Sequence, residues 1–207
     1  MARSNTLLTS TILAGLLATA AAMPLAAQEP AQDQTSAEDA AAELDPAMQL
    51  AMAALEAAPV FDGHNDVPIQ LRSRFANQIN DLDFHDTLGT GETHPQGRVM
   101  HTDLARLKQG KVGAQYWSVF VPASLDEPEA VQATIEQIDV TKRLIALYSD
   151  DLQLALTADD VETAIASGRI ASLLGMEGGH SIGSSLSVLR QMYDLGARYM
   201  TLTHSKN

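Results

Sequence analysis

The strongest constraint on the fold is a continuous apolar run at residues 170–176. A run of this length without alternation is typical of a strand that is buried on both faces, as in a parallel sheet covered by helices. Amphipathic or well-capped helices are expected around it, at residues 126–148, 157–168 and 184–194. Further strands are expected at residues 58–61, 112–121 and 197–203. Alternation of strands and helices predicts an α/β fold built on a parallel sheet.

The N-terminal part of the chain has a different composition. Arg3 precedes a small-residue apolar stretch from residue 7 to residue 22, and an A-x-A pattern at residues 20–22 offers a cleavage point. This pattern predicts a signal peptide within residues 1–27, and therefore an exported protein, periplasmic or secreted, with no transmembrane anchor after cleavage.

A separate acidic zone follows. Residues 28–45 hold six acidic side chains and no Lys or Arg. Such a segment buries too little apolar surface to offset the entropy of ordering, so we expect a disordered linker there. The folded domain is expected at residues 46–207.

Composition excludes several classes of protein. The chain has no cysteine, which excludes a disulfide framework, a thiol nucleophile and a thiolate metal site. Its formal net charge is −13, which argues against nucleic acid as a partner.

Imidazole and carboxylate groups follow the expected strands. His64 and Asp66 stand at i and i+2 after the strand that starts near residue 58, and Glu177 follows residues 170–176. Side chains at i and i+2 of a strand leave the same face, so both can reach one ion. In a (β/α) barrel the carboxyl ends of the strands form the active face. We therefore expect a metal site made by His64, Asp66 and Glu177.

Simpler interpretations exist for each of these residues. A lone H-x-D is usually a surface pair, and Glu-Gly-Gly is usually a turn. His204, at the end of the last strand, either hydrogen-bonds a substrate carbonyl or bonds a neighbouring loop. His180 is expected to have a supporting or structural role. The remaining histidines fall in a polar loop region and are expected to be solvated: His85, His94 and His101.

Three strings carry a family resemblance. They are residues 61–68 (FDGHNDVP), residues 112–119 (VGAQYWSV) and the unbroken stretch 177–207, which begins EGGHS. In this order they resemble the membrane (renal-type) dipeptidases, zinc peptidases on a TIM-like (β/α)8 barrel related to amidohydrolases.

The resemblance implies a fold, a reaction and residue roles. His64 and Asp66 would bind one zinc ion, Glu177 would act in catalysis by bridging it to a second zinc ion, and His204 would contact the substrate. The implied reaction is hydrolysis of a dipeptide by a hydroxide held between the two ions. Members of the family are often dimers, so a homodimer is expected by analogy.

Length departs from the family pattern. A closed barrel needs about 250 residues, more than residues 46–207 supply. We therefore expect an incomplete barrel, the first half to two-thirds, and a C-terminally truncated chain that is inactive alone. Two alternatives stay open: a related metal-dependent amidohydrolase acting on another amide or a lactone, and a non-catalytic binding protein derived from the barrel.

Overall fold

The computed structural model describes residues 45–205. The expected signal peptide and all of the expected linker except Asp45 lie outside the described residues. Asp45 caps helix α1 (Pro46–Ala57), since its side chain accepts a hydrogen bond of 3.2 Å from the backbone N–H of Ala47. Within the described part of the chain, no helix is long and apolar enough to cross a membrane.

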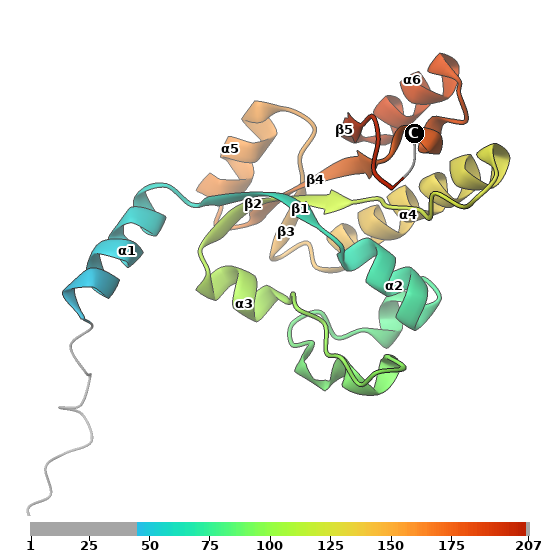
Figure 1. Ribbon diagram of the computed structural model, residues 1–207. Coiled ribbons are helices and arrows are strands. Elements are labelled where there is room, and N and C mark those ends of the chain that lie inside the picture. Colours follow the sequence, from blue (N-terminus) through green and yellow to red (C-terminus); the bar gives the residue numbers. More distant parts are fainter. Residues whose placement is uncertain (1–44, 206–207) are drawn as a thin grey trace, which may run out of the picture. The chain divides into compact units, whose positions relative to one another are not determined.

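Five parallel strands make one sheet (Figure 1). Strand β4 pairs with β2 along one edge and β2 pairs with β1. Along its other edge, β4 pairs first with β3 and then, toward its carboxyl end, with β5. The bounds of the strands are β1 (Val60–Asn65), β2 (Val112–Ser118), β3 (Leu152–Leu154), β4 (Ile170–Glu177) and β5 (Ala197–Thr201).

Helices separate most of the strands along the chain. Helix α4 packs against β3 and β4, and α5 packs against β2 and β4. Three short 3-10 segments lie in the loops. The bounds are α2 (Val67–Phe75), η1 (Ile79–Asp81), η2 (Leu88–Thr93), α3 (Leu104–Gln109), α4 (Glu127–Leu147), α5 (Ala158–Ala166), η3 (Gly179–Ile182) and α6 (Leu186–Leu195).

Strand β4 is the centre of the core. All eight of its residues are buried, as the uninterrupted apolar run predicts. Trp117 of β2 is also fully buried and packs edge-on against Phe84. The predicted parallel α/β architecture is confirmed, and in the described residues the sheet is not closed, as expected for an incomplete barrel.

Several predicted boundaries differ from the structure. Strand β2 ends at Ser118 and β5 ends at Thr201, earlier than predicted, and the short strand β3 was not predicted. The sequence at residues 70–102 predicts a long loop with at most a helical turn near residues 69–75, whereas the structure has the helix α2 there. Its C-cap, Ala76, adopts a left-handed conformation and donates its N–H to Leu71 O. Helix α3 is capped by Asp103, whose carboxylate accepts the Arg106 backbone N–H.

Candidate metal centre

The carboxyl ends of β1, β2 and β4 meet at one edge of the sheet. Asn65 is paired with Trp117, and Trp117 is paired with Leu174, so the register places the end of β1 near the end of β4. In parallel α/β folds this edge is where ligands bind.

Three ligand-type side chains converge at this edge. The Nε2 atom of His64 lies 3.4 Å from Asp66 Oδ1 and 3.3 Å from Glu177 Oε2. One donor atom from each of the three residues lies within 4.8 Å of the other two. In the described part of the chain, neither carboxylate is paired with a Lys or Arg. One imidazole nitrogen and two carboxylates are a donor set that suits a divalent cation such as zinc.

The Asp66 carboxylate is free to act as a ligand because its neighbour does the capping. Asp66 stands at the N-cap of α2, yet its side chain makes no capping hydrogen bond. Instead Asn65 Oδ1 accepts the Val67 backbone N–H at 3.2 Å. The sequence thereby separates capping, done by Asn65, from the carboxylate that faces His64.

Glu177 is the buried member of the cluster. Its side chain is 10% exposed, whereas those of His64 and Asp66 are 42% and 55% exposed. Ser118, at the end of β2, is fully buried and donates a hydrogen bond of 2.8 Å to Glu177 Oε2. The other oxygen, Oε1, lies 3.0 Å from His204 Nδ1. The two oxygens of Glu177 therefore face different partners.

Tyr199 of β5 contacts the opposite side of the His64 ring. The Tyr199 hydroxyl donates to Gly63 O at 3.3 Å and also lies 3.3 Å from His64 Nδ1. The single hydroxyl proton is used by Gly63 O, so we assign Nδ1 as the protonated nitrogen of His64. That tautomer leaves the Nε2 lone pair facing Asp66 and Glu177, which is the form of histidine that binds metal.

Tyr199 stays protonated over the pH range in which such a site works. Burial raises the pKa of Tyr199 to about 12, and nearby negative charge adds to the effect. The contributing groups are Glu177, Tyr116, Asp66 and Asp62. The phenol therefore remains a neutral hydrogen-bonding group beside His64.

Glycines fix the chain after β4. Gly178 has φ +99° and donates its N–H to Thr201 Oγ1 at 2.7 Å. Gly179 donates to Leu202 O at 3.1 Å, and a Cβ at Gly179 would lie 2.6 Å from that oxygen. These bonds join the segment after Glu177 to the segment that carries His204.

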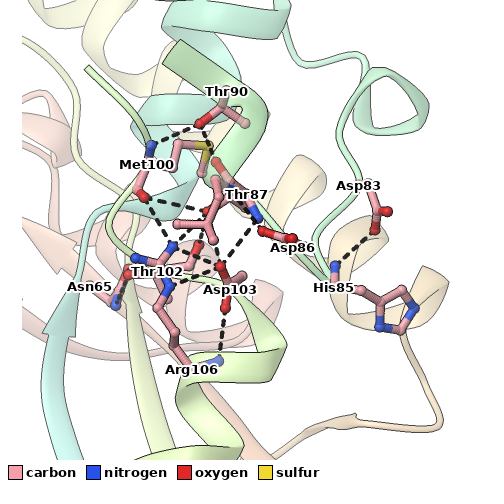
Figure 2. Close-up of polar contacts among 11 residues, drawn as sticks. Asn65, Asp83, His85, Asp86, Thr87, Thr90, Met100, Thr102, Asp103 and Arg106 are labelled. Atoms are coloured by element: carbon pink, nitrogen blue, oxygen red, sulfur yellow. Dashed lines mark hydrogen bonds and ion pairs between the residues drawn. The ribbon is translucent and has the colours of Figure 1, made fainter. Parts of the chain in front are cut away.

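A polar network supports the end of β1 from the other side (Figure 2). The Asn65 amide donates to Thr102 Oγ1 at 3.0 Å, and Thr102 O accepts the Thr87 hydroxyl at 3.1 Å. Asp103 accepts from the Thr87 backbone N–H at 3.2 Å and from Arg106 Nε at 2.9 Å. The loop before α3 is thus tied to the residue between His64 and Asp66.

The other histidines take separate positions. His180 Nε2 lies 3.2 Å from Val121 O, so its ring is bonded to a loop. His85 packs edge-on against Tyr148. His94 and His101 were expected to be solvated. Both line a cavity that also includes His64.

Two residues of the cluster, Ser118 and Tyr199, were not predicted as site residues. Ser118 is the last residue of β2, and a polar residue at the end of an apolar strand could have been recognised in the sequence as a candidate site residue. Tyr199 lies inside β5, and no sequence pattern distinguishes it from a core aromatic residue.

Comparison with known proteins identifies the family. The family model for membrane dipeptidases (peptidase family M19) matches residues 48–207. The chain belongs to the membrane dipeptidase family. It is 43% identical over 174 residues to Dipeptidase verJ of Clonostachys rogersoniana, covering 79% of this chain and 42% of that protein. It is 40% identical over 161 residues to Dipeptidase 3 of Rattus norvegicus, covering 77% of this chain and 30% of that protein.

Solved structures show the same fold. A metallo peptidase from Rhodobacter sphaeroides, liganded with a phosphinate mimic of the dipeptide L-Ala-D-Ala, aligns with a TM-score of 0.58 and 21% identity over 72% of this chain and 46% of that one. The dipeptidase AC of family M19 aligns with a TM-score of 0.59 and 23% identity over 72% and 43%. The chain thus spans less than half the length of each of these four proteins.

Proposed function

We propose that this protein hydrolyses dipeptides with zinc held by His64, Asp66 and Glu177. Membership of the membrane dipeptidase family supports the reaction class. The observation that carries the proposal is the convergence of three donor atoms, from β1, the N-cap of α2 and β4, within 4.8 Å of one another. When bound, zinc supplies a Lewis acid and lowers the pKa of a bound water from 15.7 toward about 7.

The proposed roles of the side chains follow from their contacts. His64 would bind the ion through Nε2. Ser118 would orient Glu177 Oε2 toward His64 with its 2.8 Å hydrogen bond. His204 is the proposed substrate-binding residue. Its Nδ1 contacts Glu177, so the opposite nitrogen, Nε2, is available to bond a substrate carbonyl or the oxyanion that develops from it.

A second zinc ion is part of the proposal. The two oxygens of Glu177 have separate environments, Oε2 toward His64 and Oε1 toward His204. A carboxylate arranged in this way can bridge two ions spaced about 3.5–4 Å apart. Further ligands for the second ion would come from a longer chain, and we propose that the 207-residue chain alone is inactive.

Export and domain organisation are also proposed. Residues 1–27 act as a signal peptide, residues 28–45 as a linker, and residues 46–207 as the N-terminal part of the dipeptidase barrel, in the periplasm or outside the cell. The mass of the mature protein recovered from the periplasm tests this, since cleavage after residue 22 or 27 gives distinct masses. A homodimer, proposed by family analogy, would sediment at twice the monomer mass.

The test of the reaction uses the longest protein that the gene encodes, loaded with zinc. We expect release of free amino acids from dipeptides such as Ala-Ala, and loss of that activity in Glu177→Gln. Simple lactones, offered in parallel, should not be cleaved at a comparable rate. Absence of dipeptide hydrolysis by the zinc-loaded protein, or full activity of Glu177→Gln, would refute the proposal.

A further inference from the structure

A cavity of about 450 Å³ adjoins the candidate metal centre. His64 and Asp66 form one part of its wall, and the loop before α3 forms another part. Two arginines, Arg74 and Arg98, also line it, together with His94 and His101. A group bound in this cavity would therefore lie beside the proposed ligands and among basic side chains.

Arg74 is held in place by neutral acceptors. Its Nε donates to Gln70 Oε1 at 2.6 Å. Its Nη1 donates to Arg98 O at 2.6 Å and to Thr90 O at 3.4 Å. These bonds hold the guanidinium in one position without neutralising its charge. The positive charge is therefore already in place for an anion bound in the cavity.

Among the described residues, no carboxylate forms an ion pair with the two arginines of this cavity. In the described part of the chain, neither Arg74 nor Arg98 forms an ion pair, although the sequence holds 26 acidic residues against 13 Lys and Arg. Arg98 is exposed, and its guanidinium donates a hydrogen bond to the Gln96 side-chain oxygen. Burial, with repulsion from Arg98, lowers the pKa of Arg74. The two arginines are thus close enough to repel each other without relief from a carboxylate.

His94 adds a neutral donor. Burial lowers the pKa of His94, and the charges of Arg74 and Arg98 lower it further. Its Nδ1 accepts the Gln96 backbone N–H at 3.1 Å, so in the neutral ring the proton is on Nε2. Two guanidinium groups and an imidazole N–H are the donors that recognise a planar carboxylate.

We propose that Arg74, His94 and Arg98 form a subsite for a carboxylate of the substrate, beside the metal centre. That the substrate is a dipeptide rests on the proposed function. The subsite would favour those dipeptides whose negative charge reaches this cavity. Two carboxylates of a dipeptide could fill the subsite, that of an acidic side chain or that of the C-terminus.

The first experiment measures anion binding without metal or catalysis. Succinate is titrated into the metal-free 207-residue protein, and backbone amide shifts of Arg74, His94 and Arg98 are followed by NMR. We expect saturable shifts at these residues and a Kd raised about tenfold or more in Arg98→Gln, because each charge-assisted bond to a carboxylate is a strong one. Arg98 is exposed, so this replacement leaves the core intact. Arg190→Gln, which removes an exposed charge on α6, should leave the Kd unchanged.

The second experiment distinguishes the two carboxylates in the zinc-loaded active protein. A fall of kcat/KM in Arg98→Gln for Ala-Glu but not for Ala-Gln identifies the side-chain carboxylate. A fall for Ala-Ala but not for Ala-Ala amide identifies the C-terminus. Unchanged succinate affinity in Arg98→Gln, or no saturable shifts, overturns the subsite even if zinc binds. If the parent protein binds succinate but does not bind zinc, the proposed function is refuted instead.

Discussion

Gly175 of β4 lies directly beneath the ring of Tyr199 of β5, and a Cβ at this position would overlap the ring. The paired register of Gly175 and Tyr199 places the phenol over the strand that ends in Glu177. The missing side chain is what lets the hydroxyl reach His64. A glycine in the most buried strand of the sheet thus has a role in the candidate site.

Gly175→Ala is expected to destabilise the protein and to displace Tyr199. Overpacking of a filled core costs about 1–3 kcal/mol in the free energy of unfolding. Urea unfolding measures this loss. Gly89→Ala, where a Cβ meets no atom within 4 Å, is the control and should change stability little. Equal stability of both variants would contradict the close approach.

Tyr199→Phe is expected to weaken zinc binding by about 10-fold or more, because supporting hydrogen bonds to a ligand histidine typically contribute about 10–100-fold to metal affinity. The variant keeps the ring and removes only the hydroxyl that contacts His64 Nδ1. Zinc affinity is measured by competition with a chelating dye. Tyr193→Phe, at an exposed tyrosine of α6, is the matched control. Identical affinities of the two variants would remove Tyr199 from the site.

Ser118→Ala is expected to lower zinc affinity by a similar factor, about 10-fold, since it removes the only hydroxyl that holds Glu177 Oε2 among the described residues. The same dye competition measures it. Ser172→Ala removes another fully buried hydroxyl, on β4, whose partner is Ile170 O. If Ser172→Ala lowers the affinity as much as Ser118→Ala, the effect comes from general loosening of the sheet.

The buried carboxylate of Asp103 is expected to make the stability of the fold depend on pH. Burial alone would raise the pKa of Asp103, but hydrogen bonds from Arg106 and Thr87 outweigh it and lower the pKa to about 2. A carboxyl whose folded pKa lies below its unfolded value of about 3.9 contributes stability above that value, and the contribution is lost as pH falls toward 2. The size is about 2 kcal/mol.

Asp103→Asn isolates that contribution. At pH 7 the variant should unfold about 2 kcal/mol more easily than the parent protein, and the difference should vanish near pH 2. Urea unfolding at a series of pH values measures it. A difference that stays constant down to pH 2 would show that the carboxylate charge is not responsible.

The sequence predicted the fold and the grouping of three side chains for physical reasons. A buried run such as Ile170–Glu177 is typical of a central strand in a parallel sheet, and this places Glu177 at the end of that strand. The i, i+2 spacing of His64 and Asp66 needs no long-range information. The structure brings both residues to Glu177.

Other features depend on contacts that sequence patterns do not encode. Tyr199 reaches His64 only through the register of β5 on β4, which includes a shift between Leu174 and Gly175. The loop around η2 is held by bonds such as Thr90 Oγ1 to Thr87 O, at 2.7 Å, and Met100 N to Thr90 Oγ1, at 2.8 Å. Such bonds produce no periodic apolar pattern, so the sequence does not predict the ordered structure of this loop.

The most direct measurement is the zinc affinity of the 207-residue protein and of its variant His64→Ala/Asp66→Asn/Glu177→Gln, with His85→Gln as the control for a histidine elsewhere. We predict that the parent and His85→Gln bind zinc alike, and that the triple variant loses more than the roughly 10–100-fold that supporting partners contribute. Equal zinc affinity of the triple variant and the parent would contradict the account.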